Sequence, residues 1–184
     1  MAGSLTGWGH GKSEEMAMDK GAGPTHISQV AMVVRDLDAS MKMLWETLGW
    51  GPWNVYEHVP PKLHHTHYRG KEVAFSMLGA ECEVQPGLVF ELVQPLDGPS
   101  IYKEHLEKYG EGVQHIACMM HSQADSDEFK KEWQARGAKV TMGGRIGDTI
   151  EFYYLDTEPT LKFVLESGSG HAIDLTPVRT YPPS

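Results

Sequence analysis

The predicted elements of this chain occur twice in the same order, and this internal repeat constrains the fold more than any other feature. Residues 26–35 are rich in Val, Ile and Met in an alternating pattern, which predicts a strand. Residues 37–48 place apolar side chains at helical spacing, and Gly49 supplies the stop. Three more strands are expected at 53–58, 72–78 and 88–94. The first unit is therefore β-α-β-β-β.

A short helix over 101–110 separates this unit from a second one. The pattern then begins again with a strand over 113–120 and a helix over 122–136. Three strand-like segments complete the second unit, at 139–142, 149–155 and 161–166. Repeats of this size indicate duplication, and two such units commonly close one curved sheet with a ligand pocket between them.

We predict an α+β fold organised around these two units. The first βαβββ module spans residues 24–95, a linker helix occupies 96–111, and the second βαβββ module spans 112–168. Residues 1–23 are rich in Gly, Lys and Glu and are predicted to form a flexible N-terminal arm. Residues 169–184 are predicted to form a C-terminal tail, either as an edge strand or as a wrap around the domain.

Composition and charge exclude several classes of protein. The net charge is −9, with 25 acidic against 16 basic residues, and no cluster of Lys and Arg is long enough for a nucleic-acid-binding face. No apolar run approaches the ~20 residues that a membrane span needs. The two cysteines, Cys82 and Cys118, form no C-x-x-C pair and predict reduced thiols in a cytoplasmic protein. The sequence GHGKS at 9–13 is not a phosphate-binding loop, because Thr6 stands where that motif needs Gly.

Each predicted unit offers one His in its first strand and one Glu in its last. These residues are His26 and Glu91 in the first unit, and His115 and Glu166 in the second. Because equivalent strands face each other in a two-fold pair, we expect the four side chains to converge. Two imidazoles and two carboxylates suit one divalent metal ion, namely Co, Ni, Mn, Zn or Fe. A lone His or Glu in a strand is more often a core or surface residue, and only the recurrence in both units favours a metal site.

Several other residues are candidates for contact with a substrate. Trp53 and Tyr56 are expected to share one face of their strand, where they would either hold an aromatic or apolar substrate or belong to the core. His67 belongs to a His-rich stretch, 58–71, for which we favour a solvated loop over a pocket lining or a second ion site. Arg145 lies in a Gly-rich segment, 143–147, which has the composition of a lid loop.

Three segments resemble the vicinal-oxygen-chelate superfamily, also called the glyoxalase and bleomycin-resistance superfamily. The superfamily's opening strand and helix resemble HISQVAMVVRDLDASMKMLWETLGW, and its closing strands resemble FYYLDTEPTLKFVLE. The middle of methylmalonyl-CoA epimerases is similar to FELVQPLDGPSIYKEHLEKYGEGVQHIA. The resemblance covers roughly residues 26–168. It implies a cupped eight-stranded mixed sheet with helices outside, a divalent metal ion and a homodimer.

The resemblance also implies roles for the four candidate ligands. The family's metal positions fall on His26, Glu91, His115 and Glu166, and the two glutamates become the candidates for acid and base. The implied activity is that of an isomerase or lyase, epimerase-like or glyoxalase-like, which moves a proton next to the carbonyl of a small substrate through a metal-stabilised enolate. Two alternatives stay open. One is a non-haem iron ring-cleaving dioxygenase, for which Glu91 would be a surplus ligand, and the other is a metal-free protein that sequesters a ligand.

Overall fold

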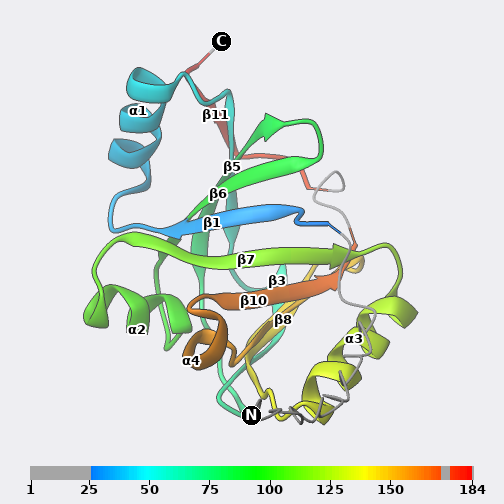
Figure 1. Ribbon diagram of the computed structural model, residues 1–184. Coiled ribbons are helices and arrows are strands. Elements are labelled where there is room, and N and C mark those ends of the chain that lie inside the picture. The colour runs from blue at the N-terminus through cyan, green and yellow to red at the C-terminus, as the bar shows by residue number, and fades with distance from the viewer. Residues whose placement is uncertain (1–25, 171–174, 184) are drawn as a thin grey trace, which may run out of the picture.

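The computed structural model describes residues 26–170 and 175–183, so the predicted arm over 1–23 and residues 171–174 and 184 of the tail lie outside the described residues. Both repeated units are present (Figure 1). The first module consists of β1 (Gln29–Val33), α1 (Leu37–Leu48), β2 (Trp53–His58), β5 (Met77–Gln85) and β6 (Leu88–Pro95). The second consists of β7 (Gly112–Met120), α3 (Gln123–Ala135), β8 (Val140–Ile146), β9 (Ile150–Leu155) and β10 (Val164–Ser169). The other elements are β3 (Leu63–Tyr68), β4 (Lys71–Glu72), α2 (Ile101–Lys108), α4 (Glu158–Leu161) and β11 (Arg179–Tyr181).

These strands form one mixed sheet, in which the strands of the two modules are arranged symmetrically about the junction of β1 and β7. The order is β11-β2-β5-β6-β1-β7-β10-β9-β8-β3-β4. In each module the first strand pairs in parallel with the last, β1 with β6 and β7 with β10. The modules meet where β1 and β7 run antiparallel, side by side in Figure 1. The predicted α+β fold of two βαβββ modules is therefore confirmed, with β3, β4 and β11 added to the eight expected strands.

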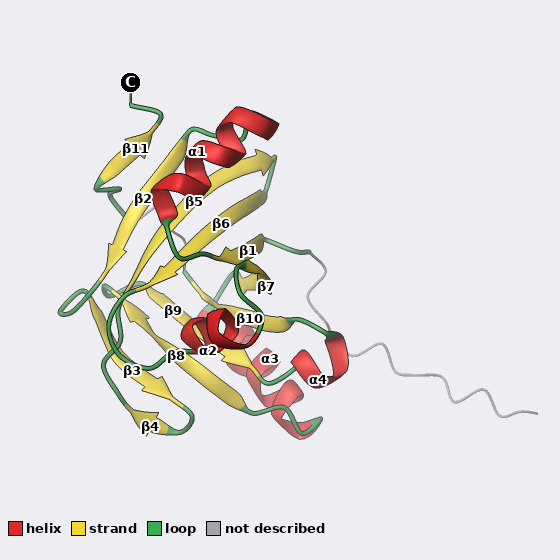
Figure 2. Ribbon diagram, turned by 90° about the vertical axis from the view of Figure 1, so that its left-hand side faces the viewer, coloured by secondary structure: helices red, strands yellow, loops and turns green. Residues whose placement is uncertain are grey.

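The helices α1 and α3 each cover the outer face of one half of the sheet (Figure 2). Helix α1 begins after Asp36, whose side chain accepts a hydrogen bond from the backbone N–H of Ala39 at 3.0 Å, and it ends at Gly49 with a φ of 70°. Its apolar side packs with Trp53 of β2 in one buried cluster. Helix α3 packs through Phe129 against the second module in another.

The inner face of the sheet carries a separate apolar cluster, which α2 covers at one end. Tyr102 and Leu106 of α2 pack with Val33 and Val93, which lie toward the ends of β1 and β6. Val33 is level with Gly112, the first residue of β7, so this is also the end at which β7 begins. Helix α2 therefore covers the apolar end of the inner face, and the polar residues described below lie farther along the strands.

The His-rich stretch after β2 is not the solvated loop that we favoured from its composition. Residues 63–68 form β3, which makes a hairpin with β4 and pairs antiparallel with β8 of the second module. Histidine is amphipathic, so the run HHTH at 64–67 gave no hydrophobic alternation by which this strand could be recognised. Strands β2 and β3 lie near opposite ends of the sheet, yet residues 59–62 alone connect them. Because such a link spans at most about 18 Å, the sheet curls into a cup that encloses its inner face.

Two further assignments differ from the sequence prediction, and the tail takes one of its two predicted forms. Strand β5 begins at Met77 rather than at residue 72, and the Gly-rich segment 143–147, expected to be a lid, largely belongs to β8. The tail supplies an edge strand, β11, which pairs with β2. Among the described residues, no helix is both long enough and apolar enough to span a membrane.

Candidate metal centre

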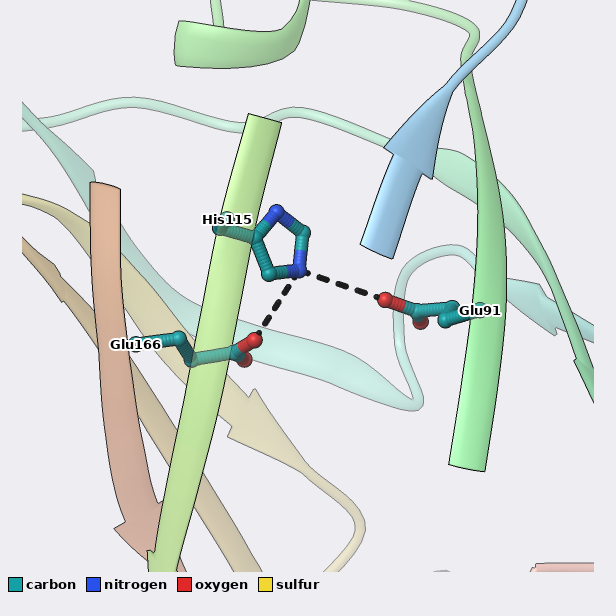
Figure 3. Close-up of side chains that lie close together, drawn as sticks. All are labelled: Glu91, His115 and Glu166. Carbon is teal, nitrogen blue, oxygen red and sulfur yellow. Dashed lines mark ion pairs between the residues drawn. The ribbon is translucent and has the colours of Figure 1, made fainter. Parts of the chain in front are cut away.

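Three potential metal ligands converge on the inner face of the cup. Glu91 comes from β6, His115 from β7 and Glu166 from β10, and all three are buried. The Nε2 atom of His115 lies 3.1 Å from Oε2 of Glu166 and 3.4 Å from Oε2 of Glu91 (Figure 3). One ligand atom from each residue lies within 4.8 Å of the others. Ligands bound at about 2.0–2.2 Å to one ion are about 3–4 Å apart, so this triad has the spacing of a single-ion site.

The register of the sheet explains why these three side chains meet. Glu91 is level with Ala31 of β1, which is in turn level with His115 of β7. His115 is level with Val164 of β10, and Glu166 follows two residues later. Residues that are level, or two apart along a strand, point to the same side of a sheet. Glu91 and His115 therefore face each other across one strand, and Glu166 stands diagonally beside His115.

The contacts between His115 and the two carboxylates are close, but they lack hydrogen-bond geometry. Within the described part of the chain, Nε2 of His115 and Oε2 of Glu166 are consequently buried without a hydrogen-bond partner. On the other side of the ring, Nδ1 of His115 lies 2.5 Å from the acceptor Oε1 of Gln114, so Nδ1 carries a proton. In the neutral imidazole, the lone pair of Nε2 then faces two carboxylates, and a bound cation would relieve this arrangement.

Burial and repulsion between like charges shift the pKa values of the cluster. Burial alone would lower the pKa of His115, but Glu166 and Glu91 outweigh burial and raise this pKa to about 9. Burial raises the pKa of Glu91, and the charge of Glu166 acts in the same direction. Burial, together with the charges of Glu91 and Glu166, also raises the pKa of Glu81, which is level with Glu91 on β5, to about 8. The inner face thus gathers carboxylates that favour a bound proton or cation.

The fourth predicted ligand, His26, is not part of the triad. Strand β1 begins at Gln29, three residues later than predicted, and His26 lies exposed before it. The His26 ring stacks on the ring of His121, with the centroids 5.8 Å apart. The prediction assigned the ligand to the first residue of an apolar segment, whereas strand pairing starts farther along that segment.

Gln29 occupies in the first module the position that His115 occupies in the second. In each module the Glu of the last strand is level with an alanine of the first strand, Ala31 or Ala117, and Gln29 and His115 stand two residues before those alanines. The nearby Gln29 side chain lowers the pKa of Glu91 and so opposes the rise that burial causes there. An amide oxygen is also a ligand for divalent cations. Gln29 is therefore a further candidate ligand, which a pattern of His and Glu alone does not include.

A spacing in the sequence marks this equivalence. Gln29 precedes Asp36, the N-cap of α1, by seven residues, and His115 precedes Ser122, the N-cap of α3, by seven residues. His26 precedes Asp36 by ten. Aligning the two units on their helix N-caps selects Gln29, whereas the recurrence of His and Glu alone does not.

The wall of the cup beside Glu166 is aromatic. Tyr154 of β9 is level with Glu166, and its ring centroid lies 5.1 Å from that of His115. The Tyr154 hydroxyl lies 2.5 Å from the hydroxyl of Tyr102 on α2, and both tyrosines are buried. Burial first, and then the nearby carboxylates, raise the pKa of both phenols well above its ordinary value. This side of the site therefore stays uncharged.

The four residues predicted to contact substrate are spread over the sheet. Trp53 is buried under α1 on the outer face, whereas Tyr56 stacks on His58 with ring centroids 6.1 Å apart and lies on the inner face. The prediction that Trp53 and Tyr56 share one face of the strand is wrong, because positions three apart in a strand point to opposite sides. His67 lies in β3 and Arg145 in β8, and neither belongs to the triad.

A separate cleft of about 880 Å³ lies beside α2 and α4. None of the three triad residues lines it, but Gln114 contributes to its wall. The Gln114 side chain, which contacts Nδ1 of His115, therefore links the wall of this cleft to the triad. The candidate site is defined by the positions of its three ligands and not by this cleft.

Comparisons with known proteins agree with this fold. The sequence profile of the glyoxalase/bleomycin resistance protein/dioxygenase superfamily matches residues 28–154. Methylmalonyl-CoA epimerase from Mycobacterium tuberculosis is similar, with a TM-score of 0.57 and 20% identity over 80% of this chain and 89% of that chain. A variant of Streptomyces coelicolor methylmalonyl-CoA epimerase in complex with 2-nitronate-propionyl-CoA gives a TM-score of 0.52 and 23% identity, over 82% of this chain and 100% of that chain.

A hypothetical protein from Bacillus halodurans C-125 is similar as well, with a TM-score of 0.58 and 16% identity over 79% of this chain and 94% of that chain. At such identities the likeness establishes the fold alone. No curated protein sequence matches this chain significantly. The arrangement of side chains on the inner face must therefore carry the functional argument.

Proposed function

Because this chain belongs to the glyoxalase/bleomycin resistance protein/dioxygenase superfamily, we propose that it is a divalent-metal-dependent isomerase or lyase. The reaction would move a proton next to the carbonyl group of a small substrate. The single observation that supports this most directly is the triad, in which Nε2 of His115 and Oε2 of Glu166 are buried without hydrogen-bond partners among the described residues. Such atoms are costly to bury unless a cation joins them.

Glu91, His115 and Glu166 would hold the ion, with the amide oxygen of Gln29 as a fourth ligand. Gln29 thus takes the place in this proposal that His26 had in the sequence-based prediction. One imidazole with three oxygen ligands suits divalent ions such as Mn, Fe, Co, Ni and Zn. When bound, such an ion supplies Lewis-acid chemistry at a carbonyl oxygen.

Glu91 is the better placed of the two glutamates to move the proton. Its Oε2 faces His115, while its Oε1 lies beside Gly79, which has no side chain to cover it. Glu166, in contrast, directs Oε2 into a fully buried contact with His115. Burial raises the pKa of Glu91, and a raised carboxyl pKa suits a general base that works near neutral pH. We therefore assign proton transfer to Glu91, in addition to its contact with the ion, and ion binding alone to Glu166.

The proposed substrate is a small molecule with a carbonyl group, in epimerase-like or glyoxalase-like chemistry. The Streptomyces coelicolor relative is recorded with a coenzyme A derivative. At 23% identity, this supports a small carbonyl compound as the class of substrate and does not specify coenzyme A. The homodimer that the resemblance implies stays a prediction.

The proposal is tested first by elemental analysis of protein purified without an affinity-metal column, beside a Glu91→Ala variant. We expect about one Co, Ni, Mn or Zn ion per chain, with less in the variant because one ligand is lost. Solvent deuterium uptake at the α-carbon is then followed by NMR, with methylmalonyl-CoA and hydroxyacetone as probes. Uptake with the loaded protein, and its loss in the chelator-treated protein, are the expected results.

Two outcomes would contradict this function. Iron retained equally by the wild type and by Glu91→Ala would favour the ring-cleaving dioxygenase, which needs only two His and one carboxylate, or an equivalent set of three ligands. Absence of metal from both proteins, together with no uptake after reconstitution, would leave a protein that binds a ligand without chemistry.

A further inference from the structure

Two neighbouring histidines of β3, which the triad does not include, place two ring nitrogens side by side. Nδ1 of His64 lies 2.6 Å from Nδ1 of His65. The His65 side chain is exposed, and that of His64 is half-buried. A second ion site was one interpretation of the His-rich stretch 58–71 in the sequence. The contact between these two rings gives that interpretation a location.

A regular strand would keep these two rings apart, because successive side chains of a strand point to opposite faces. Strand β3 departs from regular pairing at this position. Two of its residues, His65 and Thr66, stand between paired positions where β8 has only Gly144. Such a β-bulge redirects side chains and is frequent beside functional sites. The bulge therefore explains how the rings of His64 and His65 come to meet.

The backbone of His65 is left-handed, with a φ of 49°. A residue with a Cβ atom adopts this conformation at a cost, although His does so more often than most residues. Two other described non-glycine residues have a positive φ, namely Arg69 in the turn after β3 and Lys162 at the end of α4. Of the three, only His65 lies inside a strand. An uncommon conformation at such a position points to a function of the side chain that it presents.

A backbone carbonyl determines which nitrogen of His64 carries a lone pair. Nε2 of His64 lies 2.9 Å from the carbonyl oxygen of Gly147. Because a carbonyl oxygen only accepts, Nε2 carries the proton, and Nδ1 of the neutral ring has the lone pair. Histidines that bind metals commonly donate their other ring N–H to a backbone carbonyl in this way. Nδ1 of His64 is therefore oriented to accept either the proton of His65 or a cation.

The separation of the two Nδ1 atoms favours a particular kind of ion. Nitrogen ligands at about 2.0–2.1 Å from one ion are about 2.9 Å apart at a right angle and about 3.4 Å apart in a tetrahedron. The observed 2.6 Å is nearer to the right-angle value. Ligands at right angles are typical of the square-planar and tetragonal sites of Cu²⁺ and Ni²⁺, of which Cu²⁺ binds more tightly. Because His65 is exposed, water can supply the remaining ligands.

We propose that His64 and His65 form a second metal site, which binds one Cu²⁺ ion, or Ni²⁺ more weakly, through their Nδ1 atoms. The ion takes the lone pair of each nitrogen, and the proton on Nδ1 of His65 moves through solvent to its own Nε2, so both rings stay neutral. Arg145 is level with His64, but its guanidinium donates to the carbonyl oxygen of Asp148 at 3.0 Å and lies 3.8 Å from the carboxylate of Glu151. These two contacts draw its charge away from the pair.

The test is a titration of the ¹⁵N-labelled full chain with Cu²⁺, followed by NMR. The paramagnetic ion broadens the amide signals near it, so each site is identified by its own residues. We expect the amides of residues 64–66 and of Gly147 to broaden as one set, separate from the amides around the triad. The dissociation constant of each set is obtained from signal intensities at several concentrations of glycine, which competes for Cu²⁺.

Two variants assign the binding to this pair. His65→Asn removes one imidazole but keeps a residue that tolerates the left-handed conformation. It should weaken Cu²⁺ binding at this set of amides about 100-fold, the order of the gain when a second ligand is already held beside the first. His26→Asn is the matched control, because His26 is also exposed and its ring stacks on that of His121 with the centroids 5.8 Å apart. It should bind Cu²⁺ at His64 and His65 as wild type does.

Three results would overturn the second site. The first is Cu²⁺ binding that His65→Asn leaves unchanged or that His26→Asn weakens equally. The second is broadening spread over the surface histidines without a distinct set at residues 64–66. The third is a millimolar dissociation constant for wild type, which would mean that the two rings form only a hydrogen bond. The amides around the triad report separately, so a failure of the proposed function would leave this result intact.

Discussion

The two halves of the inner face have the same strand register but different side chains. In the first module Glu91 is level with Glu81, and Gly79 stands two residues before Glu81. In the second module Glu166 is level with Tyr154, and Phe152 stands in the place that corresponds to Gly79. One half is therefore polar beside its carboxylate. The other half is aromatic.

This difference shows how a duplicated fold can divide the work of one site. Backbone pairing keeps Glu91 and Glu166 in equivalent positions, so both reach His115. Their neighbours differ. Glu91 is level with a second carboxylate, that of Glu81, whereas Glu166 lies against the aromatic wall formed by Tyr154 and Tyr102.

The largest expected effect distinguishes the role of Glu91 from that of Glu166. Glu91→Gln should reduce deuterium exchange at the α-carbon of hydroxyacetone by about 10²–10⁴-fold, the usual contribution of a general base. Glu166→Gln should lose less at saturating metal, because an amide oxygen still serves as a ligand. Exchange rates and metal content are measured on the same preparations. Equal losses in both variants would show that the two halves are not divided in this way.

The second effect is the pH dependence of the metal-free protein. The fold raises the pKa of Glu81 from 4.5 to about 8 and that of His115 from 6.5 to about 9. Stability from such groups is fully present below the unfolded value and is lost as pH rises through the folded value. The Tm in chelator should therefore fall between about pH 4.5 and pH 9, as thermal melts would show.

Bound metal should oppose this fall, because it replaces the proton on His115. At a free metal concentration of 100 times Kd it adds about 2.7 kcal/mol, or roughly 5–10 °C in Tm for a chain of this length. Glu81→Gln should narrow the pH window of the metal-free protein, since it removes the lower of the two transitions. A Tm that is flat from pH 5 to 9 in chelator would contradict the charge difference between the halves.

The third effect concerns Gln29 and His115, the two different candidate ligands that the first strands of the modules supply. Gln29→His makes the two modules alike and should tighten binding of Ni²⁺ or Zn²⁺, for which imidazole is a favoured ligand. Gln114→Ala removes the acceptor for Nδ1–H of His115 and should weaken binding by about 10–100-fold. Competition with a chromophoric chelator measures both. If His26→Ala weakened binding as much as Gln114→Ala, the assignment of Gln29 would be wrong.

The smallest effect lies in the aromatic half. Tyr154→Phe leaves the buried Tyr102 hydroxyl without its partner and should cost about 1–3 kcal/mol of unfolding free energy. The double variant with Tyr102→Phe should cost less than the sum of the two single changes, because no hydroxyl is then left unpaired. Denaturant melts with exchange assays check both. A large loss of exchange in Tyr154→Phe, at unchanged stability, would give the aromatic half a chemical role.

Periodic patterns in the sequence located most elements of the fold. Helix α1 spans Leu37–Leu48, as the helical spacing of its apolar residues and the stop at Gly49 predicted. The repeat of β-α-β-β-β also predicted that Glu91 and His115 meet, together with Glu166. The hairpin β3–β4 escaped notice because His, unlike Val or Ile, leaves no alternation, and β3 is held by pairing with β8 rather than by its own apolar pattern.

The amino-acid sequence by itself therefore determined two modules, their local elements and three of the residues at the site, because hydrophobic period and helix capping are local properties. Only the tertiary structure decided that Gln29 rather than His26 stands in the fourth position, since that depends on strand register across β6, β1, β7 and β10. It also decided that the side chains of His58 and Glu91 both lie beside Gly79. Such neighbours come from different strands, and their meeting is set by pairing and sheet curvature, which no local pattern records.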